Sequence, residues 1–271
     1  MSEQPVVTRA EIAASLKKAG IHAGDLVALH SSLKSLGRVQ GGALEVIGAF
    51  QDVLTEDGTL LMPTHTYSLP MWNKTPYDKK NSPSVVGKIT DEFRLLPDVL
   101  RSDHPTHSVA ARGRLAGLLT GSTLDHPAVG PGSPWHRLLQ AGGRIVMLGA
   151  RQDANTTLHL CEALAGVPYL DVTFTPGQDF ETAHYFDGRG GVRQFTLRQV
   201  PGCSRGFNKA EPYLREKGII QDVLIVNAPT QILSAADLVE AMTEKLQSDP
   251  GFLLCDNPDC GICPRRRSAI A

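Results

Sequence analysis

The sequence predicts an α/β protein in one compact domain, with a mixed, partly parallel sheet flanked by helices. Patterns typical of helix, strand, loop, helix and strand follow one another over residues 8–62. Short apolar runs at 26–30, 59–62 and 144–148 each follow a turn that contains glycine, as expected of buried strands. From about 169 to 200 the hydrophobic period shifts towards two, which is typical of antiparallel strands.

The N-terminal elements have clear boundaries in the sequence. Thr8 and Glu11 are spaced as a capping box, which predicts a helix that ends near Gly20. The strand over 26–30 comes next, and a loop of small residues follows it. A second helix over 44–54, with apolar residues at helical spacing, precedes the strand over 59–62.

Later elements are predicted in the same way. Residues 67–83, rich in Pro, Lys, Asn and Tyr, indicate a surface loop, and Ser84 is expected to cap a helix through Leu95. After the strand over 144–148, a loop and a helix near Thr156 are expected. Helical patterns return at 206–217 and 235–246. We expect the main domain over 1–250 and a Cys-rich tail over 251–271.

Composition excludes several classes of protein. The chain has 271 residues, 41% of them hydrophobic and 20% charged, with a net charge of -1, so its overall field attracts neither nucleic acid nor an anionic membrane. The N-terminus has no basic-then-apolar signal segment, and no apolar run is long enough to span a bilayer. We therefore expect a cytoplasmic protein whose five cysteines are thiols or metal ligands.

His159 and Glu162 are the first candidate for chemistry. Helix positions three apart share a face, so the carboxylate can orient the imidazole and raise its basicity. Such a pair suits a general base, but it also suits a metal ligand or a surface contact. On spacing alone the surface contact is the commoner outcome.

Two loops are further candidates. Residues 30–42 mix hydroxyls, glycines and basic residues between a strand and a helix, which permits an anion-binding loop as well as an ordinary turn. Residues 102–113 contain His104 and His107, which permit a metal site or a loop rich in hydrogen-bonding side chains. Neither loop matches the Walker or dinucleotide patterns, and no serine lies in a Gly-x-Ser-x-Gly elbow.

Four segments taken together resemble one family. They are LHSSLKSLGRVQGGALEVI, DGTLLMPTHTYS, RSDHPTHSVAARG and NTTLHLCEALAGVPY, in that order over most of residues 20–170. This arrangement is similar to that of the aminoglycoside 3-N-acetyltransferase (antibiotic N-acetyltransferase) family. The resemblance implies an acetyltransferase domain over 1–250, with an α/β fold distinct from that of GNAT enzymes. It also implies transfer of acetyl from acetyl-CoA to an amine, in aminoglycosides the 3-amino group of the deoxystreptamine ring.

The resemblance also implies roles for individual residues. His159 would be the general base, Glu162 its orienting partner, and Thr157 would lie beside the thioester. Arg112 would contact a CoA phosphate through its planar guanidinium. The remaining CoA-binding residues would be Ser31, Ser32, Leu36, Gly37, Val39, Thr106, His107, Ser108 and Val109.

The acceptor is less constrained than the reaction. A polycationic aminoglycoside calls for carboxylates on the cleft wall, and Asp103, Asp125, Asp153 and Asp171 lie near the motifs in sequence. A different small amine remains an alternative acceptor. Alternatives from other classes are a zinc-dependent hydrolase that uses His104, His107 or His159 with the carboxylates, and a CoA- or nucleotide-binding protein without turnover.

The C-terminal cysteines form a separate candidate site. Cys260 and Cys263 are spaced as CxxC, a turn that lets two thiolates reach one metal. Cys255 and Cys203 could complete a tetrahedral structural zinc site that pins the tail to the body. A flexible tail with reduced thiols is the equal alternative. The run of arginines after Cys263 is expected to be a solvated end.

Overall fold

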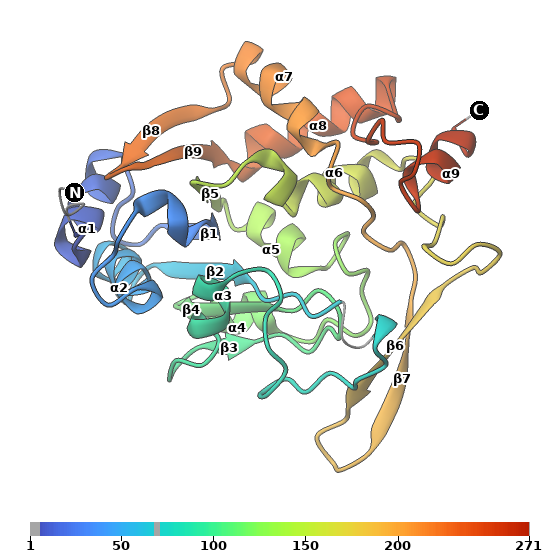
Figure 1. The fold of residues 1–271 in the computed structure, drawn as a ribbon, viewed down its shortest axis with the longest axis horizontal. Helices are drawn as coiled ribbons and strands as arrows, with labels where there is room; N and C mark the ends of the chain where they lie inside the picture. The colour runs from blue at the N-terminus through green and yellow to red at the C-terminus, as the bar shows by residue number, and fades with distance from the viewer. Residues whose placement is uncertain (1–5, 68–70, 271) are drawn as a thin grey trace, which may run out of the picture.

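The computed structural model describes residues 6–67 and 71–270 (Figure 1). Residues 1–5, at the N-terminus, and 68–70, part of the predicted loop over 67–83, lie outside the described residues. Of the described helices, none is both long enough and apolar enough to cross a membrane.

Helices and strands alternate along most of the described chain. The helices are α1 (Arg9–Lys18), α2 (Ala43–Leu54), α3 (Lys88–Phe93), α4 (Ala116–Thr120), α5 (Pro134–Gln140), α6 (Thr157–Ala165), α7 (Ala210–Glu216), α8 (Ala235–Ser248) and α9 (Cys263–Ser268). The strands are β1 (Leu26–Ser31), β2 (Thr59–Pro63), β3 (Leu100–Arg101), β4 (Val109–Gly113), β5 (Arg144–Leu148), β6 (Glu181–Phe186), β7 (Val192–Leu197), β8 (Gln221–Ile225) and β9 (Ala228–Ser234).

The main sheet is mixed, as predicted. Its strand order is β3-β4-β2-β1-β5-β9-β8. The central strand β1 runs parallel to β2 and to β5, and the other pairings are antiparallel. The sheet is therefore parallel at its centre and antiparallel towards both edges.

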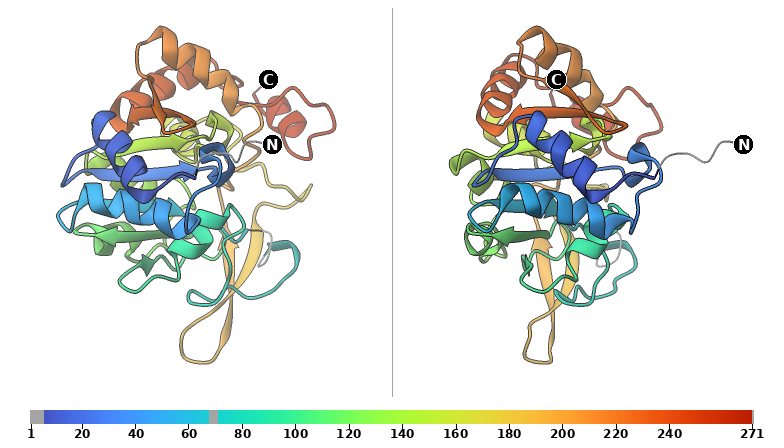
Figure 2. Two further views of the ribbon diagram at one scale, coloured as in Figure 1. Left: turned by 60° about the vertical axis from the view of Figure 1, so that its left-hand side comes forward. Right: turned by 90° about the vertical axis from the view of Figure 1, so that its left-hand side faces the viewer.

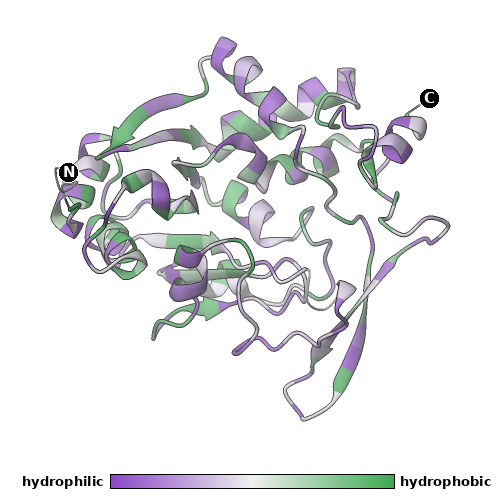
Figure 3. Ribbon diagram, in the orientation of Figure 1, coloured by the Kyte–Doolittle hydropathy of each residue, from purple (hydrophilic) through white to green (hydrophobic). Residues whose placement is uncertain are grey.

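Helices cover both faces of this sheet (Figure 1 and Figure 2). On β1, Val27 and Leu29 pack into a core shared with α1, α2 and α3, whereas Leu26 and Ala28 belong to the core on the other face, with α5, α6 and α8. This alternation follows from the period of two along a strand. Figure 3 shows hydrophobic and hydrophilic residues interleaved along α8. This is expected of a helix that packs one face on a sheet and exposes the other to solvent.

Several local predictions are confirmed. Thr8 and Glu11 form the capping box of α1, and the strands predicted at 26–30, 59–62 and 144–148 are β1, β2 and β5. The predicted helix over 235–246 is α8, with Ser234 as its cap. The period-two region contains the hairpin β6–β7, which projects from the body (Figure 1), although strand structure begins only at Glu181.

The predicted helix cap at Ser84 is wrong. Helix α3 begins later, after Gly87, whose φ of +143° lies outside the helical region. The chain before it is not helical, and the Val85 N–H donates outside the helix, to the carbonyl of His65 at 2.9 Å. The Ser84 hydroxyl is instead hydrogen-bonded to the Thr90 hydroxyl, and the Ser84 N–H donates to the carboxylate of Asp91.

Candidate active site

The principal cavity, about 830 Å³ in volume, opens where the parallel strands end. His30 and Ser31 at the end of β1 line it, together with Pro63 at the end of β2 and the loop from Asp153 that follows β5. Ligand sites of α/β sheets commonly lie at the carboxyl ends of such strands. The opposite wall comes from residues 200–205, from Phe207 and from residues 260–262.

His159 and Glu162 meet inside the protein, next to this cavity. His159 Nδ1 lies 2.6 Å from a carboxylate oxygen of Glu162 on the same helix, α6. The hydroxyl of Tyr169 donates to the other oxygen of that carboxylate at 2.8 Å. Both oxygens of Glu162 are therefore engaged, and His159 is the member of the pair that lines the cavity.

Electrostatics keep the Glu162 carboxylate ionised. Burial alone would raise the pKa of Glu162, but the contact with His159, the charge of Arg266 and the Tyr169 hydroxyl together lower it. Burial and the neighbouring carboxylate also raise the pKa of Tyr169, so its hydroxyl stays protonated as a donor. The imidazole thus faces a fixed negative charge on the side away from the cavity.

A chain of buried carboxamides fixes the start of α6. Gln231 on β9 accepts from Gln152 at 2.6 Å, and Gln152 accepts from Asn155 at 2.9 Å. The side-chain oxygen of Asn155 in turn accepts from the Thr157 N–H at 3.1 Å, which satisfies one of the free donors of the first helical turn. The position of His159 therefore depends on the sheet as well as on its own helix.

Phe207 holds the other side of the His159 ring. The two ring centroids lie 4.6 Å apart in an edge-on arrangement. Nε2 of His159 makes no hydrogen bond within the described part of the chain, and the residue is 8% exposed, at the cavity wall. This nitrogen is available to a ligand.

Other polar atoms at the cavity wall are also without partners. Nε2 of His30, Oγ of Ser31 and Nε2 of His65 are buried and make no hydrogen bond to described residues. Burial lowers the pKa of both His30 and His65 to about 3, so these rings are neutral near pH 7. Buried polar groups without partners are costly, which marks this wall as a place for ligand hydrogen bonds.

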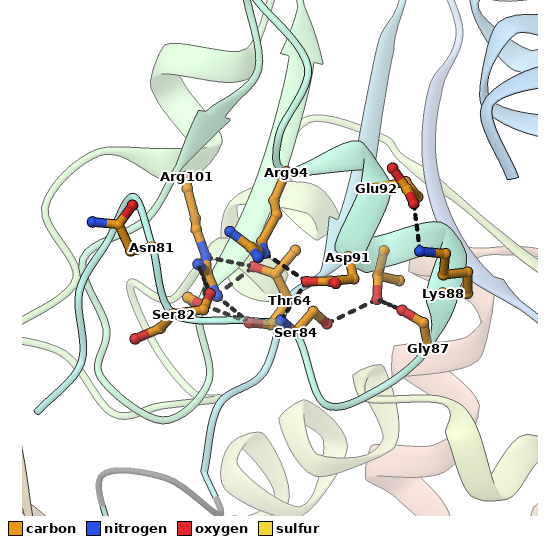
Figure 4. A network of polar contacts seen from close by, with 12 residues as sticks. Thr64, Asn81, Ser82, Ser84, Gly87, Lys88, Asp91, Glu92, Arg94 and Arg101 are labelled. Carbon is orange, nitrogen blue, oxygen red and sulfur yellow. Dashed lines mark hydrogen bonds and ion pairs between the residues drawn. The ribbon is translucent and has the colours of Figure 1, made fainter. Parts of the chain in front are cut away.

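A buried arginine, Arg101, joins two chain segments through a network of polar contacts (Figure 4). The guanidinium of Arg101 donates to the carbonyls of Thr64 and Ser82, at 2.8 Å and 2.6 Å. Thr64 follows β2, and Ser82 precedes the segment 85–87 that lines the cavity. The network therefore joins two chain segments whose neighbouring residues line the cavity.

Of the residues predicted to bind CoA, two line this cavity, Ser31 and His107. The Ser108 hydroxyl donates to the Thr64 carbonyl, and Val109 is buried in the core. Arg112 pairs with Leu60 on β2, three residues before Pro63 at the cavity edge, which is about 10 Å along a strand. Further predicted residues that do not line the cavity are Ser32, Leu36, Gly37, Val39 and Thr106.

Thr157 also lies off the cavity. Its side chain is buried with its hydroxyl unpartnered among the described residues, and Thr156 lines the cavity beside it. Tyr169 and Phe207, which contact the catalytic candidates, were not identified from the sequence because no local pattern links them to α6. Tyr67, Trp72 and Phe174 also line the cavity and were not singled out.

The histidines do not gather as metal ligands. Within residues 6–67 and 71–270, the group of three or more His, Cys, Asp or Glu placed to hold a metal is the cysteine set Cys203, Cys255, Cys260 and Cys263. Nδ1 of His104 accepts from the N–H of His107 at 3.1 Å and so serves the backbone of its own loop. This geometry gives no support to a zinc-dependent hydrolase at His104, His107 or His159.

One of the four aspartates considered for a cationic acceptor lines the cavity, Asp153. Asp103 instead accepts from the hydroxyl and N–H of Thr123. The wall also carries the aromatic rings of Tyr67, Trp72, Phe174 and Phe207. The cavity therefore offers a cation one exposed carboxylate and several aromatic faces.

The C-terminal arginines are not a solvated run. Arg266 is 2% exposed and donates to the carbonyl of Val200 at 2.6 Å, and Arg265 donates to the carbonyl of Phe174 at 2.8 Å. The prediction of a solvated end is wrong for these two, because the short helix α9 turns their side chains towards the body.

Comparison with known proteins identifies the family. The profile described as Aminoglycoside 3-N-acetyltransferase matches residues 28–247. The chain belongs to the aminoglycoside 3-N-acetyltransferase family. Its members are acyltransferases, and the family likeness seen in four segments of the sequence is confirmed.

Individual relatives of the family cover nearly the whole chain. Aminoglycoside N(3)-acetyltransferase IV of Salmonella sp is 32% identical over 248 residues, 91% of this chain and 90% of that protein. Aminoglycoside N(3)-acetyltransferase VII of Streptomyces paromomycinus is 31% identical, over 90% of this chain and 94% of its own.

Solved structures of the family share the fold. Aminoglycoside acetyltransferase AAC(3)-IVa superposes with a TM-score of 0.87 at 29% identity over all of both chains, and a mutant of it has been solved with a gentamicin. AAC-IIIb, solved as a binary complex with CoASH, has a TM-score of 0.78 at 26% identity, over 90% of this chain and 97% of its own. The predicted non-GNAT α/β fold is thereby confirmed.

Proposed function

We propose that this protein transfers acetyl from acetyl-CoA to an aminoglycoside, at its 3-amino group, with His159 as general base and Glu162 as its orienting partner. The observation that carries this proposal is the His159–Glu162 contact of 2.6 Å on the wall of the main cavity. Family membership supports the reaction class, and the CoASH complex of AAC-IIIb supports the acetyl donor.

In this mechanism Glu162 selects the imidazole tautomer. Its carboxylate can only accept, so Nδ1 of His159 carries the proton and Nε2 keeps its lone pair towards the cavity. Nε2 removes a proton from the acceptor ammonium, since only the free amine is a nucleophile. The ionised Glu162 then stabilises the imidazolium that forms.

The acyl transfer itself is direct. The amine lone pair forms the new C–N bond at the thioester carbonyl, whose electron pair moves onto oxygen. The tetrahedral intermediate collapses with cleavage of the C–S bond, and the second amine proton passes to the departing sulfur, so CoA leaves as a thiol. The imidazolium of His159 then loses its proton to solvent, which restores the base. Hydroxyls on the cavity wall, Ser31 and Thr156, are candidate donors to the oxyanion, with Thr157 behind them.

We propose that acetyl-CoA binds along the residues that the family resemblance implies. Ser31 and His107 line the cavity, and CoA would continue from there along the loop that contains Ser32, Leu36, Gly37 and Val39 and past residues 106–109. Gly37 has φ of +83°, which allows a close backbone approach there. A contact between Arg112 and CoA would require a phosphate group of CoA to lie outside the cavity.

The acceptor side has a second candidate. A wall with one carboxylate and the aromatic rings of Tyr67, Trp72 and Phe174 also suits a smaller amine that carries less charge. Gentamicin and apramycin, which were bound to AAC(3)-IVa mutants, are the reference aminoglycosides.

A thiol-release assay with acetyl-CoA tests the proposal. Gentamicin, apramycin and a panel of small monoamines are compared by kcat/KM, and the acetylated nitrogen is assigned by NMR. We expect the aminoglycosides to be preferred and the 3-amino group to be modified. CoA binding with no release of thiol for any amine would contradict the proposed reaction. Preference for a monoamine would support acetyl transfer but contradict the proposal of an aminoglycoside acceptor.

A further inference from the structure

The four cysteines of the C-terminal region converge on one point. Cys203 follows β7, Cys255 follows α8, and Cys260 and Cys263 flank the turn into α9. Their sulfur atoms all lie within 4.8 Å of one another, and those of Cys203 and Cys255 lie 3.8 Å apart. A tetrahedral zinc site with Zn–S bonds of about 2.3 Å places its sulfurs about 3.8 Å apart.

The surroundings suit a closed metal site. Cys255, Cys260 and Cys263 are 7%, 8% and 1% exposed, so little of these thiols reaches solvent. The Arg205 N–H donates to the sulfur of Cys203 at 3.4 Å, a contact that favours a thiolate. All four thiols are free, and a sulfur separation of 3.8 Å is far from the disulfide bond length of about 2.05 Å.

We propose that Cys203, Cys255, Cys260 and Cys263 bind one zinc ion, and that this structural site fixes the wall of the catalytic cavity opposite the sheet. Binding deprotonates the thiols and releases their protons to solvent. With four protein ligands no position is open for substrate, so the role is structural.

The ligands themselves belong to the cavity wall. Cys203 and Cys260 line the cavity, together with their neighbours Gly202, Ser204 and Ile262. Residues 200–204 lie in no helix or strand, so no ladder of backbone hydrogen bonds positions them. A metal that joins Cys203 to the tail would supply the missing constraint.

Close backbone packing lets the two segments meet at this point. A Cβ on Gly206 would lie 2.3 Å from the carbonyl oxygen of Leu253, so the chain after Cys203 presses directly on the chain before Cys255. Phe207 follows at once and packs on the ring of His159. The short segment from Cys203 to Phe207 therefore links the zinc site to His159, the proposed base. The tail over 251–271 thus helps to position the cavity wall as well as to stabilise the fold.

Metal analysis tests the site independently of catalysis. Untagged protein purified without chelator is expected to contain about one zinc per chain, and the Cys203→Ser and Cys260→Ser variants very little. Cys161→Ser, which changes a buried thiol outside the cluster, is the matched control and should keep the metal. Less than half an equivalent of zinc in the unmodified protein, iron in its place, or zinc retained in both variants would overturn the assignment.

A cobalt-substituted protein covers the case in which a variant does not fold. Cobalt bound by four thiolates in the unmodified chain is expected to give intense thiolate-to-metal absorption and the visible bands of tetrahedral geometry. An octahedral spectrum without thiolate bands would overturn the ligand set.

Kinetics test the link to the cavity, and this part rests on the proposed function. Removal of zinc by a strong chelator is expected to raise the acceptor KM by about tenfold or more, with recovery when zinc is added back. An acceptor KM that is unchanged in demonstrably zinc-free protein would overturn the link. If the transferase proposal itself is wrong, the zinc-loaded protein will show no turnover, which is a different result from an unchanged KM.

Discussion

The contact between Tyr169 and Glu162 allows a sharp prediction for Glu162→Gln. In the native protein Tyr169 donates to one carboxylate oxygen at 2.8 Å, and the other lies 2.6 Å from His159 Nδ1. A glutamine has one oxygen and one NH₂ group, and the Tyr169 donor selects the oxygen for its own side. The NH₂ group then faces Nδ1, which must accept, so the proton moves to Nε2 and the ring can no longer act as a base.

The expected loss follows from the role of the base. Loss of a positioned general base lowers the rate by about 10²–10⁴-fold, which is about 2.7–5.4 kcal/mol in activation free energy. Because the side chain keeps its shape and its contact with Tyr169, we expect the fold and the KM for acetyl-CoA to change little. The loss should therefore appear in kcat.

A double variant separates the tautomer from the loss of charge. With Tyr169→Phe added to Glu162→Gln, no hydroxyl holds the carboxamide oxygen, which can turn towards His159 and restore the active tautomer. We expect a recovery of kcat by about tenfold, the worth of one hydrogen bond, in the thiol-release assay, with Tyr169→Phe alone as control. A kcat for Glu162→Gln within about threefold of the native value, or no recovery in the double variant, would refute the reasoning.

Three further predictions concern the cavity and the fold. Asp153→Asn should raise the KM for a cationic acceptor by about two- to fivefold, since Asp153 is exposed; the effect should shrink with added salt, and a salt-independent KM would contradict it. The lowered pKa values of His30 and His65 mean that the unfolded chain binds more protons than the folded one below the ordinary histidine pKa. The free energy of unfolding should therefore fall as the pH decreases from about 6.5 towards 3, by up to about 1.4 kcal/mol per pH unit for each histidine; urea titrations near neutral pH and near pH 5 measure this, and equal midpoints would speak against it. Gly113→Ala should lower the stability by about 3 kcal/mol or more, because φ is +114° and a Cβ would meet a backbone oxygen at 2.0 Å. Gly20→Ala, with φ of +82° and open space around it, isolates the backbone strain alone, and an equal loss of thermal stability in both variants would show that the contact is unimportant.

Local chemistry explains which parts of the fold were predictable from the sequence. The capping box of Thr8 and Glu11 and the buried strands over 26–30 and 144–148 depend on neighbouring residues, so their patterns are visible in the chain. The start of α3 was not predictable from the sequence. Ser84 has the right side chain for a helix cap, but the backbone conformation of Gly87 and the hydrogen bond from the Val85 N–H to the His65 carbonyl delay the helix. Tertiary contacts override local preference there.

The candidate site divides in the same way. His159 and Glu162 are close because of helical spacing, which a sequence displays. Tyr169 and Phe207 reach the pair through the packing of separate segments, and nothing in their own neighbourhoods indicates it. The arginines after Cys263 looked like a solvated end by composition alone, whereas the contact of Arg266 with the Val200 carbonyl depends on where α9 lies.

The turnover of His159→Asn tests the central claim most directly. Asparagine retains a polar side chain at the cavity wall but has no basic nitrogen, so the variant should bind CoA with nearly the native Kd and lose about 10²–10⁴-fold in kcat for acetyl transfer. Calorimetry for CoA and thiol release for turnover, on the same preparation, give both values. A native kcat in a folded His159→Asn protein would contradict the assignment of His159 as the general base.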